Sequence, residues 1–195
     1  DLMEGLRFIL SHRVMLVLIL MVGVTSFFGV SYTTFMPVFA NDILRVGAKG
    51  LGVLMSVTGL GALSAALGLA WLGDFRHKGR LLAISAMVFS LSLIIFASSR
   101  SYLLSLAALM LIGWSSITAT SLINTVLQQL VPDRFRGRLM SVYMFTFAGF
   151  MPFGNLLAGT LAHSWGVSLT VMFSGVVCTL FFLSINIFYP QIKNI

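Results

Sequence analysis

The side chains best suited to chemistry lie in the stretch 114–130, where hydroxyls, amides and a tryptophan recur among apolar residues. Five of them follow a spacing of 4, 3, 4 and 3 residues, which places them on one face of a helix. They are Trp114, Thr118, Ser121, Thr125 and Gln128, and Asn124 and Gln129 add two further amides. An amide in an apolar environment needs a hydrogen-bonding partner, which is another helix, water or a ligand. The stripe therefore predicts either a binding surface or a helix contact.

Side chains that would support catalysis or metal binding are few and scattered. His12, His77 and His163 lie far apart and show no metal-ligand spacing. Cys178 is the single cysteine, so the chain forms no internal disulfide and no cysteine-based metal cluster. A phosphate-binding Gly-Lys-Ser/Thr loop is also missing from the sequence. We therefore expect no enzyme, no cofactor, no metal site and no ATP-driven pump.

Composition indicates what must position the stripe. Hydrophobic residues make up 58% of the 195 residues and charged residues 9%, with a mean hydropathy of +1.03. A soluble domain would have about a quarter charged residues, so this chain belongs in a bilayer. The net charge of +7 comes from basic residues in the loops between apolar segments, where topology and lipid headgroups explain it. Nucleic acid is therefore not an expected partner.

Six apolar segments are long enough to cross a hydrocarbon core of roughly 30 Å, which predicts an all-α integral membrane fold. Their approximate bounds are 14–40, 51–72, 81–97, 102–130, 139–162 and 168–189. The amphipathic stretch 1–13 predicts an interfacial helix or a linker turn, and 190–195 a short tail. Pro132 should begin a basic loop over 133–138, and Pro152 should kink the fifth segment.

Basic residues divide unevenly between the two sides that six crossings define. One side has nine: Arg7, Arg13, Arg76, Lys78, Arg80, Arg134, Arg136, Arg138 and Lys193. The other has three: Arg45, Lys49 and Arg100. Because cytoplasmic loops are rich in lysine and arginine, both termini are predicted to be cytoplasmic. Three spans per repeat force opposite topology on the two repeats, so the span count also predicts a 3+3 inverted repeat.

Three segments together resemble the carboxyl-terminal six-helix half of a major facilitator superfamily transporter. Residues 73–80 (GDFRHKGR) resemble the loop Gly-x-x-x-Asp-Arg-x-Gly-Arg-Arg between the second and third helices of a half, with extra residues between the acid and the second glycine. Residues 132–138 (PDRFRGR), followed by Gly149, Pro152, Gly154 and Gly159, resemble drug and siderophore exporters of macrolide-efflux or enterobactin-exporter type. Residues 4–8 (EGLRF) resemble the end of their central cytoplasmic linker.

The resemblance implies half of a twelve-helix secondary transporter of the bacterial inner membrane, in which two halves rock about a midplane site. It implies efflux of a small amphipathic drug, antibiotic or siderophore, with an amino-terminal half and membrane lipid as partners. The implied substrate-binding residues are Tyr32, Phe35, Trp114, Thr118, Ser121, Asn124, Gln128 and Asn155, each of which could instead serve packing. The implied cytoplasmic gate or latch residues are Asp74, Arg80, Asp133 and Arg138.

The acids of the chain refine this expectation. All five lie at predicted helix ends or in loops: Asp1, Glu4, Asp42, Asp74 and Asp133. A proton relay normally uses ionisable groups inside the membrane, so a proton-coupling acid is expected in the amino-terminal half. A chain that opens on Asp1 in a linker-like stretch looks like a fragment. The alternative is a stand-alone six-span channel or a homodimeric carrier.

Overall fold

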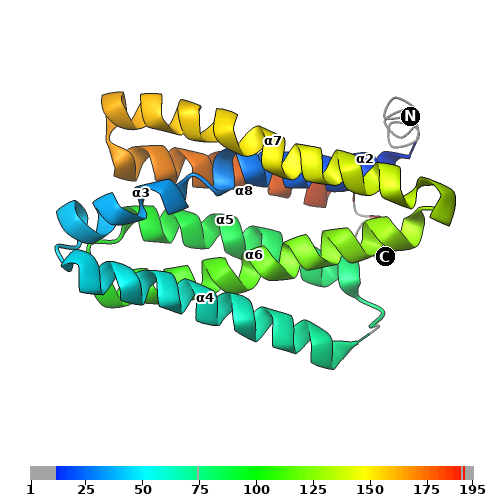
Figure 1. Ribbon diagram of the computed structural model, residues 1–195, viewed down its shortest axis with the longest axis horizontal. Coiled ribbons are helices and arrows are strands. Elements are labelled where there is room, and N and C mark those ends of the chain that lie inside the picture. Colours follow the sequence, from blue (N-terminus) through cyan, green and yellow to red (C-terminus); the bar gives the residue numbers. More distant parts are fainter. Residues whose placement is uncertain (1–11, 74, 190, 192–195) are drawn as a thin grey trace.

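The computed structural model describes residues 12–73, 75–189 and 191, and the regular elements within these ranges are all helices (Figure 1). Most of the expected interfacial stretch 1–13 and of the tail 190–195 lies outside the described residues, as does Asp74. Six helical segments are long and apolar enough to cross a membrane: Arg13–Ile43, Gly47–Leu72, Lys78–Ser98, Tyr102–Leu130, Asp133–Trp165 and Val167–Phe188. The predicted all-α fold with six membrane spans is confirmed.

The first span is assembled from four short pieces. These are α2 (Arg13–Val24), the π-helix η1 (Thr25–Gly29), α3 (Tyr32–Val38) and the π-helix η2 (Phe39–Ile43). At the first break, the Val30 amide donates to the Thr25 carbonyl over five residues at 3.1 Å. The Ser31 hydroxyl donates to the Phe28 carbonyl at 3.0 Å. Serine and threonine hydroxyls compete with helical hydrogen bonds in this way, and π-turns of this kind are frequent at functional sites.

Each of the other five spans is one continuous helix. They are α4 (Gly47–Leu72), α5 (Lys78–Ser98), α6 (Tyr102–Leu130), α7 (Asp133–Trp165) and α8 (Val167–Phe188). Only Gly166 separates α7 from α8, and its φ of +83° is a conformation that glycine adopts without strain. α7 continues through Pro152, and the expected kink at this proline stays a prediction.

The expected loop over 133–138 is instead the beginning of α7. Pro132 precedes the helix with an extended ψ of 146°, and Asp133 occupies the first turn. A carboxylate there interacts favourably with the positive end of the helix dipole. Arg136 reaches back to Asp133 at 2.8 Å, which adds an i,i+3 ion pair. Arginine is also a good helix former, so the basic stretch has no need to unwind.

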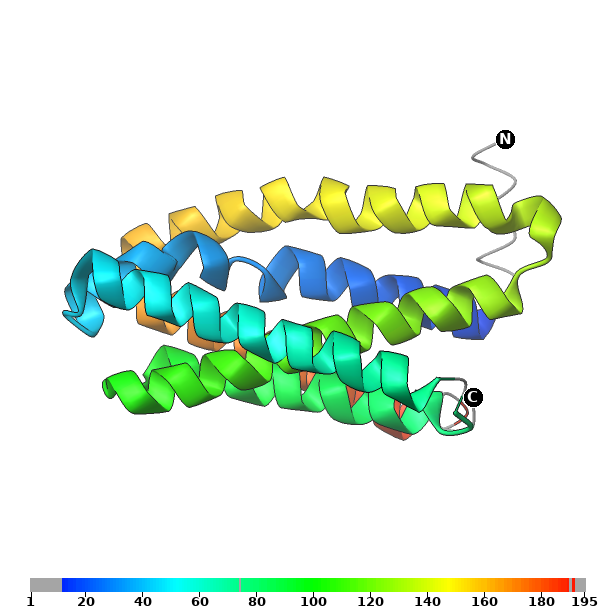
Figure 2. The same ribbon diagram turned by 60° about the horizontal axis from the view of Figure 1, so that its bottom comes forward.

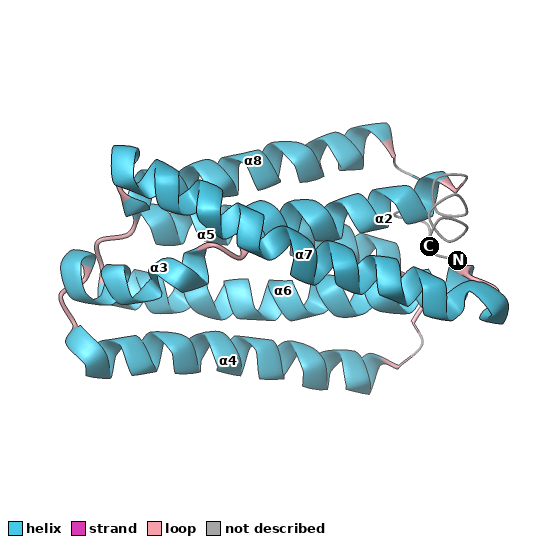
Figure 3. Cartoon of the chain, turned by 45° about the horizontal axis from the view of Figure 1, so that its top comes forward, coloured by secondary structure: helices cyan, strands magenta, loops and turns pink. Residues whose placement is uncertain are grey.

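The helices form one bundle in which the second and fifth spans lie at opposite edges (Figure 1), and in the turned view α4 comes forward, in front of α6 (Figure 2). α4 packs along α6, α6 along α5, and α5 along α8, while α7 packs on η1, α2 and α8 (Figure 3). Span two therefore pairs with span four, and span five pairs with span one in the same way. Spans three and six lie side by side. This is the packing that a 3+3 inverted repeat produces.

The two edge helices bury the least apolar surface. In both α4 and α7, 17% of the membrane-spanning window is buried, against 33–50% in the other four spans. Their outward faces are rows of large apolar side chains, such as Leu63 and Leu67 on α4 and Phe153 and Leu156 on α7. These faces are available to lipid or to another membrane helix.

Candidate functional site

The broken part of the first span is attached to α7 by three contacts. The Ser26 hydroxyl donates a short hydrogen bond to the backbone carbonyl of Phe147. Gly154 lies so close to η1 that an added Cβ would collide with the Phe27 carbonyl. Further along, the Thr34 hydroxyl lies 3.5 Å from the Asn155 side-chain oxygen. Irregular backbone at membrane depth is tolerated where protein surrounds it, and α7 supplies that surrounding here.

A line of polar side chains on α6 faces α7. They recur every four residues, and two aromatic residues one turn apart on α7 lie against them. We call this set the α6–α7 strip: Ser116, Thr120, Asn124 and Gln128 with Tyr143 and Phe147. The α6 members are all half-buried, as expected of groups that border open space.

Three members of the α6–α7 strip form a hydrogen-bonded network. Gln128 donates through its side-chain amide to the Asn124 side-chain oxygen in a short bond. The hydroxyl of Tyr143 is hydrogen-bonded to the Asn124 side chain. The Asn124 amide nitrogen also lies 3.9 Å from the Met140 sulfur. Within the part of the chain that the structure describes, this network joins α6 to α7 through side-chain amides and a phenol without using a charged group.

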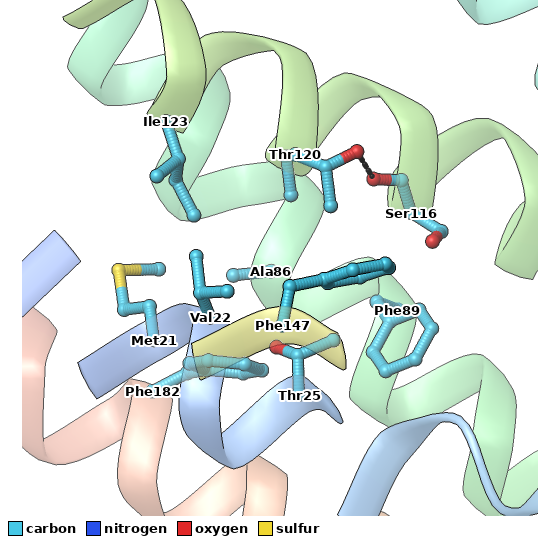
Figure 4. A pocket seen from close by; sticks show the side chains of 11 residues that line it. Met21, Val22, Thr25, Ala86, Phe89, Ser116, Thr120, Ile123, Phe147 and Phe182 are labelled. Atoms are coloured by element: carbon cyan, nitrogen blue, oxygen red, sulfur yellow. Dashed lines mark hydrogen bonds between the residues drawn. The ribbon is translucent and has the colours of Figure 1, made fainter. Parts of the chain in front are cut away.

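At the other end of the strip, Phe147 closes a small cavity of about 20 Å³ beside η1 (Figure 4). Its wall combines apolar side chains with three hydroxyl groups. The lining residues are Met21, Val22, Thr25, Ala86, Phe89, Ser116, Ala119, Thr120, Ile123, Phe147 and Phe182. A volume of this size holds about one water molecule. Helices from five of the six spans therefore meet around a single phenylalanine ring.

A second, larger space lies along the same seam between the first span and α7. This groove has a volume of about 460 Å³. Its lining is apolar apart from one hydroxyl: Ile19, Leu20, Gly23, Val24, Phe27, Phe28, Val142, Thr146 and Phe150. The Thr146 hydroxyl donates to the Val142 carbonyl of its own helix at 2.8 Å, so the groove offers little to a polar ligand.

The residues expected to bind substrate occupy unequal positions. Asn124 and Gln128 meet in the α6–α7 strip, and Asn155 meets Thr34 across the α3–α7 contact. Trp114, Ser121 and Phe35 are half-buried. Tyr32 is buried with its ring 6.4 Å from that of Phe96. Thr118 is buried, and its hydroxyl donates to the Trp114 carbonyl at 2.7 Å.

The expected substrate-binding residues did not include Ser116, Thr120, Tyr143, Phe147 or Thr25. A signal for two of them was present, because Ser116, Thr120, Asn124 and Gln128 recur at a spacing of four and therefore also share a helical face. The 4, 3, 4, 3 stripe and this second line share only Gln128. Choosing between two polar faces of one helix requires knowing where its neighbours lie.

The charged residues at the end of the bundle where α4 gives way to α5 and α6 to α7 make local contacts. Lys78 is buried at the start of α5, and its ammonium donates to the Gln129 side-chain oxygen at 3.1 Å. Arg80 is exposed. Asp133 pairs with Arg136 at the start of α7, and the Arg138 guanidinium lies 5.7 Å from the centre of the Phe135 ring. Asp74 lies outside the described residues, so the latch role expected of Asp74 and Arg80 stays a prediction.

Metal chemistry finds no support in the described ranges. Among residues 12–73, 75–189 and 191, no three His, Cys, Asp or Glu side chains come together. Of the acids in these ranges, Asp42 lies in η2 at the end of the first span and Asp133 at the start of α7. Neither the small cavity nor the groove is lined by a charged side chain.

The sequence matches a known family over almost its whole length. A family model of the major facilitator superfamily, described as "Transmembrane secretion effector", matches residues 1–194. The chain belongs to this family. Membership in this family accounts for the six membrane spans.

Curated relatives of this transmembrane secretion effector family member are transporters. The chain is 27% identical over 163 residues to the "Staphyloferrin A transporter" of Staphylococcus aureus, which covers 81% of this chain and 40% of the relative. It is 28% identical over 127 residues to "Myo-inositol transporter 2" of Schizosaccharomyces pombe, a match that covers 65% of this chain and 22% of that relative. It is 28% identical over 136 residues to "Myo-inositol transporter 1" of Candida albicans, a match that covers 66% of this chain and 24% of that relative. The chain thus matches less than half the length of each relative.

Proposed function

We propose that this chain is the carboxyl-terminal half of a secondary transporter that exports a small amphipathic molecule across a bacterial inner membrane by alternating access. The observation that carries the proposal is the α6–α7 strip beside the broken first span. Hydroxyls and the Phe147 ring lie beside the π-turn at which the first span loses its regular backbone, and the amides continue the strip from there toward the end of α6. Transporters of inverted-repeat design use discontinuous helices near the midplane for substrate binding.

The open faces of α4 and α7 support a partner half. Both helices leave most of their apolar window unburied. The matched relatives extend far beyond the aligned region, which leaves length for further spans. In this proposal an amino-terminal six-helix half covers these faces, and membrane lipid covers the remainder.

The proposed binding residues divide into two groups. Asn124 and Gln128 form the polar core of the site, because their amides already form a hydrogen-bonded network with Tyr143. Trp114, Ser121, Phe35 and Asn155 complete it from partly open positions. Tyr32 and Thr118 would act by holding the first span and α6 in place, since both are buried.

Direction and coupling are further parts of the proposal. A relative is named for staphyloferrin A, so a compound of siderophore size and polarity is a fitting cargo. No aspartate or glutamate lies in mid-span anywhere in the sequence, which supports assigning a proton-coupling acid to the other half. The nine-to-three division of basic residues supports cytoplasmic termini.

The proposal is tested by expressing the full-length transporter in a bacterial strain that lacks its own copy. Compounds in the medium and in the cells are compared by liquid chromatography and mass spectrometry. We expect at least one amphipathic compound to accumulate in the medium, and Gln128→Leu to reduce that accumulation several-fold. Thr160→Val is the matched control, because this hydroxyl is exposed and bonds to the carbonyl of Leu157 in its own helix. Depletion of a compound from the medium, or no difference from the empty strain, contradicts export.

A further inference from the structure

The Phe147 ring occupies a cavity between the first span and α6 whose size and lining suit a ligand. It points from α7 into the small cavity, with Thr25 on one side and Ser116 and Thr120 on the other (Figure 4). The cavity is small because this ring fills it. Removing the ring would leave a space close to the size of a benzene molecule, and apolar spaces of that kind bind benzene.

Phe147 differs from the residues around it in how it is held. Val22, Phe89, Ile123 and Phe182 are each at most 3% exposed, whereas Phe147 is 36% exposed. Its backbone is fixed, because its carbonyl accepts the Ser26 hydrogen bond within a continuous helix. The side chain can therefore leave the cavity by a rotamer change alone. Partly exposed side chains change rotamer in picoseconds to nanoseconds, without any movement of helices.

The chemistry of the cavity wall selects the group that would replace the ring. Most of the wall is apolar, and no charged side chain contributes to it. The Thr120 hydroxyl is already used, since it donates to the Ser116 carbonyl at 2.8 Å. The hydroxyls of Thr25 and Ser116 remain to pair with one polar atom of a ligand. A charged group would lose its hydration here without gaining a partner of opposite charge.

We propose that this cavity is a subsite for a neutral aromatic ring of the substrate, and that Phe147 is a displaceable plug which fills it when no ligand is bound. The inference rests on the proposed function and adds a substrate class to it. The polar part of the same molecule would extend along the α6–α7 strip toward Asn124 and Gln128. The free energy of displacing Phe147 lowers the affinity for every ring by the same amount, and the shape and chemistry of the cavity wall determine which rings fit.

The test measures binding of 4-fluorophenol to the full-length transporter in lipid nanodiscs by ¹⁹F NMR, with empty nanodiscs subtracted. We expect Phe147→Ala to bind the probe about tenfold more tightly than wild type, the lower end of what an apolar pocket gains from a fitting group. Phe145→Ala is the matched control, because that ring is on the same helix and 70% exposed. It should bind as wild type does. The charged probe 4-fluorobenzoate should not bind to any of the three proteins.

Two further variants keep the test decisive. If Phe147→Ala does not fold, Phe147→Leu, which keeps more side-chain volume than alanine does, should still bind the phenol more tightly than wild type does. Adding Ala119→Phe to either variant refills the cavity from α6 and should abolish the gain. Equal binding by wild type, the Phe147 variants and Phe145→Ala overturns the subsite. Tighter binding without any exported compound would sustain the subsite and overturn the proposed export.

Discussion

Two helix crossings occupy equivalent places in the inverted repeat and are built differently. Where α4 crosses α6, Gly61 lies against the Met110 backbone and Gly113 against the Thr58 backbone, so two continuous helices touch through a reciprocal pair of glycines. Where α7 crosses the first span, Gly154 lies against Phe27 in a π-turn. The first crossing is tight on both sides. The second has the Phe147 cavity and the 460 Å³ groove along it.

The difference shows how one architecture separates rigidity from binding. Small residues on both helices let backbones approach closely, which is the main source of helix association in a membrane. At the α7 crossing only Gly154 meets backbone, Gly23 meets the Thr146 side chain, and the bulged backbone gives less complementary surfaces. The spaces left over become the cavity and the groove, and a hydrogen bond from Ser26 replaces part of the lost packing. The site in the second region thus depends on imperfect packing there.

The largest expected effect comes from filling the tight crossing. Gly61→Leu should destabilise the full-length protein by more than about 3 kcal/mol, because the new side chain meets backbone that cannot move aside. Gly154→Leu should cost less, about 1–3 kcal/mol, since the π-turn can shift into the neighbouring groove. The measurement is the fraction of monodisperse protein after heating, by fluorescence-detected size-exclusion chromatography.

Matched controls exist for both glycines. Gly59 on α4 and Gly159 on α7 have nothing within 4 Å of an added Cβ, so leucine at either should change stability by no more than about 0.5 kcal/mol. A Gly154→Leu protein as unstable as Gly61→Leu would show that the two crossings are equally rigid, and the comparison would be wrong.

An intermediate effect is expected from the network in the α6–α7 strip. Asn124→Leu leaves the Gln128 amide and the Tyr143 hydroxyl without their shared partner, which should cost about 1–3 kcal/mol for each group that stays buried. Because Gln128 is half-buried and can turn to water or ligand, we expect the lower end of this range. Thermal stability in detergent and export by the intact transporter should both fall. Ser121→Leu is the control, because Ser121 is half-buried but lies outside the network. If Asn124→Leu were as stable as Ser121→Leu, the network would have no structural role.

The smallest expected effect compares one hydroxyl from each crossing. Ser26→Ala removes a bond between helices and should cost about 1 kcal/mol. Thr58→Val should change stability little, since the Thr58 hydroxyl donates to the Leu54 carbonyl of its own helix at 2.9 Å rather than to a group on α6. Thermal melting of the two variants side by side measures the difference. If Thr58→Val were the more damaging change, the α4–α6 crossing would depend on polar contacts rather than on its glycines.

Much of the fold could be predicted because membrane spans are recognised by length and hydropathy. The predicted 102–130 segment is α6 with the same bounds. Prediction failed where local chemistry competes with hydropathy. Charged residues at 133–138 looked like a loop, yet Asp133 and the arginines favour the first turns of α7. The π-turn at Thr25–Gly29 could not be read from the hydropathy of the first span, because its cause includes a bond from Ser26 to another helix.

The candidate site was predicted less completely for a related reason. α6 has two polar lines, and periodicity ranks them equally. Asn124 and Gln128 belong to the line that faces α7, whereas Thr118 is buried and bonds to its own helix. Phe147 gave no signal at all, since the sequence surrounds it with four other phenylalanines between positions 135 and 153.

By itself the sequence determined an all-helical membrane protein of six spans with no acid in mid-span. Those properties follow from the free energy of moving each side chain from water to lipid, which depends on residue type and local order alone. Tertiary structure decided which face of α6 meets α7, where the first span breaks, and which phenylalanine fills a cavity. The first depends on contacts between two different helices, such as Asn124 with Tyr143. The other two depend on contacts between residues more than 100 positions apart, such as Ser26 with Phe147 and Phe27 with Gly154. No local pattern encodes a neighbour that far along the chain.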